Sequence, residues 1–126
     1  MGYYVIIQSC KIKLPKELTN DDTNTVNAVI KILDDNDIVN DYWLVEDNEI
    51  VPVEYDLNLD DNLDTSLGDL DDDFYKSLKY LSKVGCTGYV ELSGDNGEWV
   101  KFVLKDGKLF IYYAEMTYPK KPTYVL

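Results

Sequence analysis

Carboxylates are the side chains of this chain most able to do chemistry, and they are densest between Asp60 and Asp73. That stretch reads DDNLDTSLGDLDDD, with seven carboxylates in fourteen residues and no basic residue. Carboxylates this close together could bind a cation, supply an acid and a base for hydrolysis, begin a helix or face a basic partner. The surrounding residues decide between these uses.

The segment from Asp56 to Leu67 opens with the D-x-N-x-D ligand spacing of a calcium loop. That loop also requires glycine at its sixth position and a bidentate glutamate at its twelfth. These two positions are Asp61 and Leu67 here. We therefore expect no specific metal site and no cofactor, and the sequence leaves open loose cation binding by the cluster.

Residues that the chain lacks argue against catalysis. There is no histidine and no arginine, so Ser-His and Cys-His systems have no base and bidentate phosphate clamps have no guanidinium. The cysteines, Cys10 and Cys86, give no disulfide framework or zinc site, and we expect buried reduced thiols. Hydrolysis by two carboxylates stays formally possible, but nothing singles out a pair among 24 acids. We expect a protein that is not an enzyme.

Charge is divided unevenly along the chain. Between Asn20 and Asp73 there are 18 acids and one lysine, Lys31, which gives −17; the remainder has 11 lysines and 6 acids, which gives +5, and the sum is the net −12. Such asymmetry indicates electrostatic recognition. Direct nucleic-acid binding is not expected, because lysines without arginine on an anionic protein meet a polyanion unfavourably.

Length and hydropathy predict one domain over residues 1–126. We expect it in the cytoplasm, which for a protein encoded by a mobile element is that of the host cell. The chain of 126 residues is 45% hydrophobic, which suits a single folded core. No continuous apolar run approaches the length of a membrane span, and the start MGYYVIIQ lacks signal-peptide features. We therefore expect no membrane partner.

The hydrophobic pattern predicts an α+β fold in the order β-α-β-β-α-β-β-β, with an antiparallel curved sheet and two helices packed on one face. In the strand Ile50 to Leu59, the odd residues from Val51 are expected on one face and an acidic row on the other. Expected elements are strands at Tyr3 to Leu14, Asp41 to Glu46, Ile50 to Leu59, Gly88 to Ser93, Glu98 to Lys105 and Lys108 to Glu115, and helices at Asp21 to Asp35 and Asp69 to Val84.

The turn Asp106-Gly107 predicts a type I′ hairpin between the last two strands. Its register would pair Leu104 with Leu109, Val103 with Phe110 and Phe102 with Ile111. One face of the hairpin is then apolar and belongs to the core. The opposite face is also largely apolar and must be covered or used, and its members are Trp99, Val103, Phe110 and Tyr112.

Two stretches, MGYY at the start and LSGDNGEWVKFVLKDGK from Leu92 to Lys108, resemble a loose group of small uncharacterised phage and prophage proteins. These open with MGYY and carry a late SG, GE-W and DGK hairpin. The resemblance covers Met1 to Tyr4 and Leu92 to Lys108. It does not include the stretch from Asn20 to Asp73, which we call the acidic window. It implies an origin on a mobile element and carries over no activity.

The charge surplus exceeds the net charge of about 2 to 8 that keeps a small domain soluble, and excess charge destabilises a compact state. Seventeen charges correspond to about 29 Å of duplex, and a domain of this length is about 36 Å across. We therefore predict a non-enzymatic, phage-encoded DNA mimic that inhibits a basic nucleic-acid-binding host protein, such as a restriction enzyme, a CRISPR effector or a repressor. The expected partner-binding residues are Asp60, Asp61, Asp64, Asp71, Asp72 and Asp73, with Tyr42, Trp43 and Tyr55 as aromatic anchors.

Two alternatives remain from other classes. The same electrostatics would suit an immunity protein that neutralises a basic toxin nuclease, and the neighbouring genes would separate these two. The apolar outer side of the last hairpin would instead suit a homodimer or larger homo-oligomer without an inhibitory role.

Overall fold

The computed structural model describes residues 3–33, 37–59, 73–94, 97–114 and 120–126. In these ranges the chain forms seven strands and three α-helices, with one short 3-10 turn at Lys16–Leu18. The helices are α1 (Thr23–Leu33), α2 (Ile38–Tyr42) and α3 (Asp73–Val84). The strands are β1 (Tyr3–Lys13), β2 (Trp43–Glu46), β3 (Glu49–Pro52), β4 (Asp56–Leu59), β5 (Thr87–Gly94), β6 (Trp99–Lys105) and β7 (Lys108–Tyr113).

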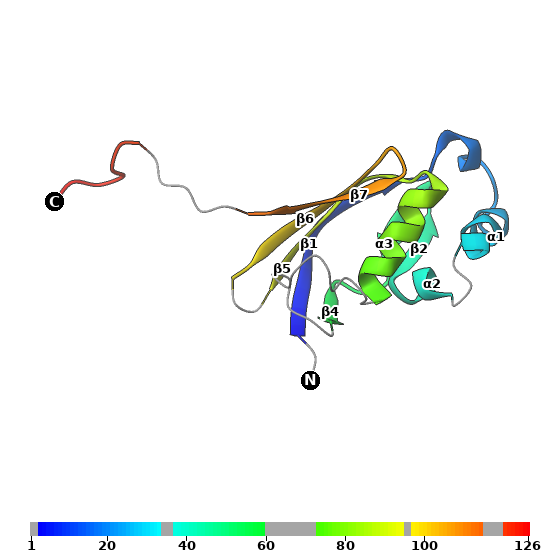
Figure 1. Cartoon of the computed structure of the whole chain (residues 1–126), viewed down its shortest axis with the longest axis horizontal. Helices are drawn as coiled ribbons and strands as arrows, with labels where there is room; N and C mark the ends of the chain where they lie inside the picture. The colour runs from blue at the N-terminus through cyan, green and yellow to red at the C-terminus, as the bar shows by residue number, and fades with distance from the viewer. Residues whose placement is uncertain (1–2, 34–36, 60–72, 95–96, 115–119) are drawn as a thin grey trace.

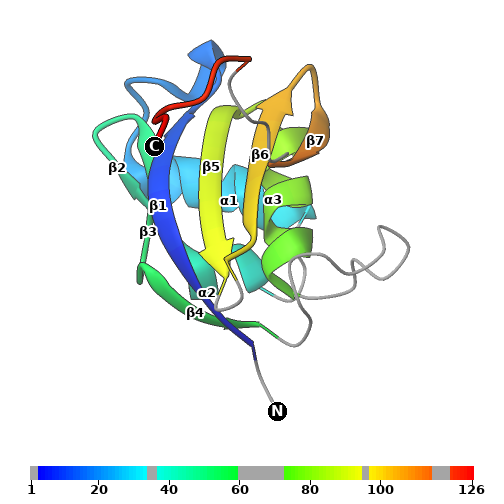
Figure 2. The same cartoon turned by 90° about the vertical axis from the view of Figure 1, so that its left-hand side faces the viewer.

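The strands form one antiparallel sheet in the order β2-β3-β1-β5-β6-β7, with β4 also paired to β1. Strand β1 pairs with β5 along most of its length, and its other edge pairs with β4 at the start and with β3 at the end. The three helices lie together on one face of the curved sheet (Figure 1), and the opposite face is open to view in Figure 2. The predicted α+β class is confirmed, with one helix more than expected.

The core lies between this inner sheet face and the helices. Helix α3 buries Phe74, Leu78 and Leu81, as the spacing of its apolar residues predicts. Phe74 contacts Phe102 of β6 edge to face, with ring centroids 6.4 Å apart. Alternate residues of the strands complete the core, namely Val5, Ile7, Val90, Leu92, Val100, Phe102 and Leu104.

The last hairpin has the register that its turn predicts. Leu104 pairs with Leu109, Phe102 with Ile111 and Val103 with Phe110. Asp106 and Gly107 have φ of 54° and 73°, as the two central residues of a type I′ turn require. Gly85, with φ of 108°, ends α3 as expected.

Two strand predictions are wrong in part. Residues 41–42 belong to α2 instead of a strand, and α2 follows Asp37, whose φ is 59°. The strand expected over 50–59 divides into β3 and β4, because the chain leaves the ladder after Pro52, which has no N–H to donate. Ile50 and Pro52 therefore face inward before the break and Leu57 faces inward after it, while Val53 and Tyr55 are exposed.

Candidate functional site

The predicted acidic site lies only partly within the described residues. Asp60, Asp61, Asp64, Asp71 and Asp72 fall in 60–72, outside the described ranges. Asp73 is the first residue of α3 and is exposed. Its carboxylate is next to the positive end of the helix dipole, which favours negative charge at this position.

The three predicted aromatic anchors are in three different environments. Tyr55 is 57% exposed in the link between β3 and β4, as an anchor must be. Tyr42 is half-buried and its ring meets Phe74 edge to face at 5.5 Å. Trp43 is 1% exposed, so its assignment as a partner-binding anchor is wrong.

The position of Trp43 has a clear physical cause. It begins β2 on the inner face of the sheet, where its indole lies 5.8 Å from the Phe74 ring. Its Nε1 donates a hydrogen bond of 2.9 Å to Oγ of Ser77, and that hydroxyl donates to the Phe74 carbonyl at 2.6 Å. A buried indole N–H needs such a partner. Both the ring and the N–H of Trp43 therefore make their contacts inside the core.

All but one of the described carboxylates of the acidic window are exposed. Ten of the 18 fall in the described ranges, and nine of these are exposed; Glu49 is half-buried. They occupy the start of α1, the helix α2, the β2–β3 turn, the β3–β4 link and the start of α3. They are Asp21, Asp22, Asp37, Asp41, Glu46, Asp47, Glu49, Glu54, Asp56 and Asp73.

Lysines neutralise little of this charge. Within the described ranges the one ion pair joins Lys11 Nζ to Glu49 Oε1 at 3.3 Å. The other described lysines outside the window lie on β1, α3, β6, β7, the 3-10 turn and the C-terminal segment, while the window itself has only Lys31. The 3-10 turn and α3 carry both signs, but within the described ranges no exposed carboxylate of the window forms an ion pair with a lysine.

The carboxyl of Asp22 has a lowered pKa, and a hydrogen bond at the start of α1 is the cause. It caps α1, because its Oδ1 accepts a hydrogen bond of 2.7 Å from the Thr25 amide. This bond, joined by one from the Thr25 side chain, lowers the pKa of the Asp22 carboxyl. Its carboxylate thus caps the helix start, where aspartate is one of the preferred residues.

Neither cysteine is suited to act as a nucleophile. Burial, with a smaller effect of nearby Glu49, raises the pKa of the Cys10 thiol to about 11. Burial raises the pKa of the Cys86 thiol to about 12. Both side chains are free thiols, as expected, although Cys10 is only partly buried. The reactive thiolate form is therefore scarce at neutral pH.

The outer hairpin face, defined as Trp99, Val103, Phe110 and Tyr112, was expected to be covered or used, and three of its four side chains are exposed. Trp99 is 42% exposed, and Phe110 and Tyr112 are also exposed. Two hollows, of about 200 and 330 Å³, are both lined by Trp99 and Tyr113. Lys101, which pairs with Tyr112, extends over the ring of Tyr89 at 4.7 Å from its centroid.

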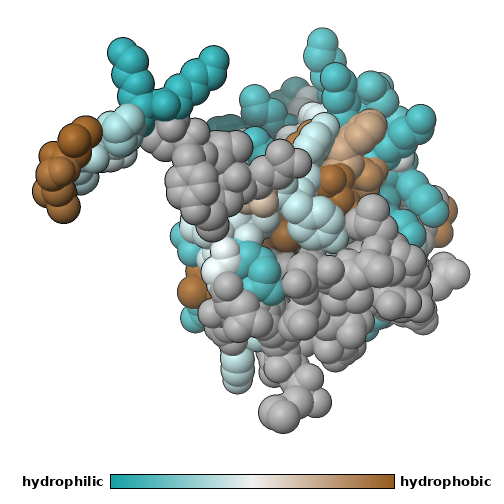
Figure 3. Space-filling view, turned by 60° about the vertical axis from the view of Figure 1, so that its left-hand side comes forward, coloured by the Kyte–Doolittle hydropathy of each residue, from teal (hydrophilic) through white to brown (hydrophobic). Residues whose placement is uncertain are grey.

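Other exposed apolar residues were not singled out from the sequence. Tyr4 and Ile6 on β1 and Leu44 on β2 are exposed. The alternation of Val5 and Ile7 with these neighbours on β1 is the signal that could have found them, since it places Tyr4 and Ile6 on the outer face. At the C-terminal end, Tyr124, Val125 and Leu126 are exposed, and the hydrophobic end of this segment stands clear of the sheet in Figure 3.

The described ranges contain no group of three or more metal-ligating side chains. None of the helices in these ranges combines the length and the apolar character needed to cross a bilayer. Comparison of the chain with protein-family models, with curated proteins and with solved structures finds no match.

Proposed function

We propose that this chain is a non-enzymatic binding protein that imitates nucleic acid and occupies the nucleic-acid site of a basic protein. The observation that carries the proposal is the separation of charge: nine exposed carboxylates in the described part of the window have no lysine partner there, and Glu49 alone is paired. Asp22 and Asp73 stabilise helix starts, but like charges repel one another, so the other unpaired carboxylates destabilise a compact domain. A basic groove would be complementary to them.

The spacing of the exposed carboxylates suits imitation of a row of phosphates better than binding of a single ion. The described acids are spread over five segments from α1 to α3. Acids that alternate along a strand or lie four apart on a helix are roughly 6 to 7 Å from each other. This is close to the separation of successive phosphates, so the surface would present several charges in series. The exposed ring of Tyr55, beside Glu54 and Asp56, would supply an apolar contact among them.

The test begins with capture of partners from a bacterial lysate at low salt, followed by a salt ramp. The proposal expects a captured nucleic-acid-binding protein that is released steeply by salt and displaced by duplex DNA. The variant Asp41→Asn with Asp47→Asn and Asp56→Asn should weaken binding and flatten the salt dependence. The matched control, Glu17→Gln with Glu91→Gln and Asp106→Asn, changes three acids outside the window and should leave binding unchanged.

Binding that persists unchanged at 0.5 M salt, or a partner that duplex DNA does not displace, would overturn the proposal. Equal weakening by the control variant would also overturn it, because the effect would then follow net charge alone.

A second candidate function, homodimer formation, is favoured by the outer hairpin face. Contiguous exposed aromatic side chains on a sheet face mark association surfaces. If two copies associate here, Trp99→Asp should convert a dimer to a monomer in size-exclusion chromatography with light scattering. Ile32→Asp is the control, because Ile32 on α1 is 76% exposed and lies on the opposite side of the sheet. A wild-type monomer would rule this function out.

A further inference from the structure

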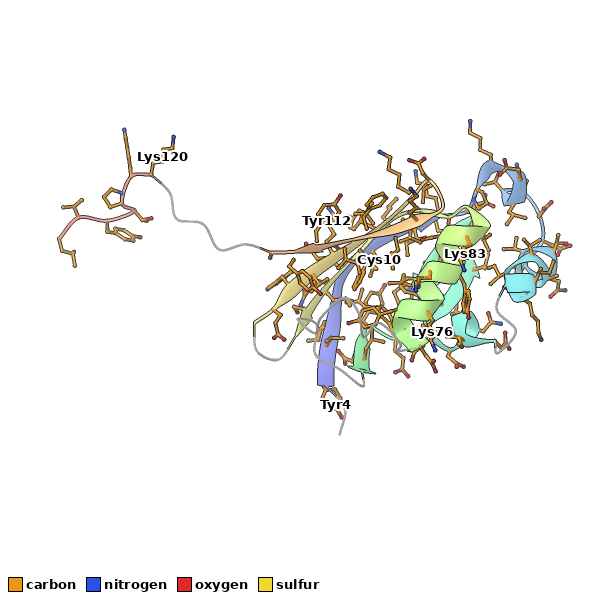
Figure 4. All side chains as sticks on the ribbon, in the orientation of Figure 1. Tyr4, Cys10, Lys76, Lys83, Tyr112 and Lys120 are labelled. Carbon is orange, nitrogen blue, oxygen red and sulfur yellow. The ribbon has the colours of Figure 1, made fainter. Side chains whose placement is uncertain are left out.

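A row of lysines runs along the exposed side of α3 and continues onto β7. Lys76, Lys79 and Lys83 follow the helical spacing i, i+3 and i+7, and Lys76 and Lys83 mark the two ends of the row in Figure 4. Lys79 and Lys83 line two adjoining hollows. The smaller, of about 200 Å³, is completed by Lys76 and Tyr80. The larger, of about 340 Å³, lies between α3 and the β6–β7 turn and is completed by Ser82, Gly107, Lys108 and Leu109.

Positive charge in these hollows is not compensated by the protein. No acid is among the lining residues of either hollow, and none of the four lysines forms an ion pair within the described ranges. Lysines three and four residues apart on a helix repel one another. The helix dipole accounts for Lys83 in the last turn, but not for Lys76 near the start of α3 or for Lys108 on another element.

Ser82 supplies a second and independent observation. The residue is 1% exposed and lines the larger hollow. Its Oγ is buried and has no hydrogen-bond partner in the part of the chain that the structure describes. Ser77 on the same helix shows the usual state of a buried hydroxyl, with one bond donated and one accepted. An unsatisfied buried hydroxyl is uncommon in a folded protein and requires an explanation.

We propose that the larger hollow binds the phosphate group of a small organic phosphate of about mononucleotide size. Lysine ammonium groups bind phosphate as point charges, and a serine hydroxyl can donate to a phosphate oxygen. A hollow of about 340 Å³ is within the range of small-molecule sites. Leu109 in the larger hollow and Tyr80 in the smaller offer apolar surface to the organic part. The site is distinct from the acidic window and does not depend on the proposed function.

Titration of the full chain with three probes tests the site, with binding followed by amide NMR shifts and calorimetry. Adenosine 5′-monophosphate is expected to bind and to shift the amides of Ser82, Lys83 and Lys108. Inorganic phosphate is expected to bind more weakly at the same amides, and adenosine is expected not to bind.

Variants give the decisive comparison. Lys79→Gln with Lys83→Gln should weaken binding of the monophosphate at least about tenfold, and Ser82→Ala should weaken it about two- to tenfold. Lys31→Gln with Lys101→Gln removes the same charge elsewhere and should change affinity less than twofold, a margin of about 0.4 kcal/mol.

Three results would overturn the proposal. They are the absence of monophosphate binding at millimolar concentration, equal weakening by the control variant, and binding of duplex DNA at these amides without binding of the monophosphate. None of these results tests the binding of a basic protein to the acidic window, which is expected to depend on salt. The phosphate site and the proposed function can therefore be disproved independently.

Discussion

The two faces of the sheet carry one tryptophan each, and the two side chains are in opposite environments. Trp43 on the inner face is 1% exposed, stacks near Phe74 and donates its N–H to Ser77. Trp99 on the outer face is 42% exposed and borders two hollows. The same residue type is therefore packed in the core in one place and exposed on the surface in the other.

This difference shows that the two faces of the sheet have different roles. Side chains on the inner face stabilise the fold, and side chains on the outer face are accessible from solvent. The inner face is closed by three helices, and the largest fully buried side chains lie there. On the outer face Trp99, Phe110 and Tyr112 are exposed. None of α1, α2 and α3 lies on that side of the sheet (Figure 2), and Tyr112 lies on the side of the sheet away from α3 in Figure 4. Substitutions on the inner face should therefore change the free energy of unfolding, and those on the outer face should change association.

The separation of faces requires that β1 and β5 keep their pairing, and Gly88→Ala should break it. A Cβ at Gly88, where φ is 132°, would lie 1.9 Å from the backbone oxygen of Lys11. Because backbone has to move, we expect a loss of more than about 4 kcal/mol in the free energy of unfolding, measured by urea denaturation. Gly97→Ala is the control, since its φ is 82° but nothing lies within 4 Å. It should lose only about 1 to 2 kcal/mol.

Removal of the inner tryptophan should have the next largest effect. Trp43→Ala leaves a cavity beside Phe74 and deprives Ser77 of one hydrogen bond, so we expect a loss of about 3 to 5 kcal/mol in unfolding free energy. Thermal and urea unfolding measure it. A loss below about 1 kcal/mol would show that Trp43 is not in the core.

The outer tryptophan should contribute much less to stability. Trp99→Ala is expected to cost about 1 kcal/mol or less, because no cavity forms at a side chain that is 42% exposed. The matched variants Trp43→Phe and Trp99→Phe separate the two indoles by fluorescence. The indole of Trp99 should be quenched readily by acrylamide, and that of Trp43 should be protected. Equal quenching would contradict the division of the two faces.

The smallest effect is expected at the start of α1, where Asp22→Ala removes the cap of the Thr25 amide. The pKa of the Asp22 carboxyl is lowered in the folded state, so the carboxylate stabilises the fold above its unfolded pKa and this contribution is lost as pH falls through the folded value. The melting temperature of wild type should exceed that of the variant at pH 7, and the difference should close below pH 3.8, the ordinary value.

Asp22→Asn is the control for this prediction, because asparagine also caps helices but does not titrate. A difference between wild type and Asp22→Ala that is constant from pH 7 to pH 3 would contradict the role of the charge.

Much of the fold could be predicted because its signals are local. The Asp106-Gly107 turn determines the pairing of β6 with β7, and the apolar spacing of α3 determines its buried side. The region from 37 to 56 could not be predicted in the same way. Val and Ile occupy both odd and even positions around Ile50, so alternation does not identify the inner face. The chain also leaves the sheet between Pro52 and Asp56, and the inward residues change from even to odd positions before Leu57.

The candidate site was predictable in its charge but not in its aromatic residues. Removing a carboxylate from water is costly, so acids stay on the surface and the exposure of Asp37, Asp41 and Asp73 follows from their type. Tryptophan has no such constraint, and Trp43 is buried because Ser77, 34 residues away, accepts its N–H. The lysine row on α3 was visible in the sequence only as spacing. Its hollow with Lys108 depends on the hairpin lying beside the helix.

The first strand of the chain has a consequence for biosynthesis. Strand β1 is at the centre of the sheet, and its long partner is β5, so that Gln8 and Ser93, which share a hydrogen bond, are 85 residues apart. During translation the apolar residues of β1 leave the ribosome long before β5 exists, and until then they lack their main partner. At about 5 to 20 residues per second, that interval is of the order of 4 to 17 seconds. Chaperone dependence and misassembly should therefore be concentrated at nascent β1, before β5 has been made.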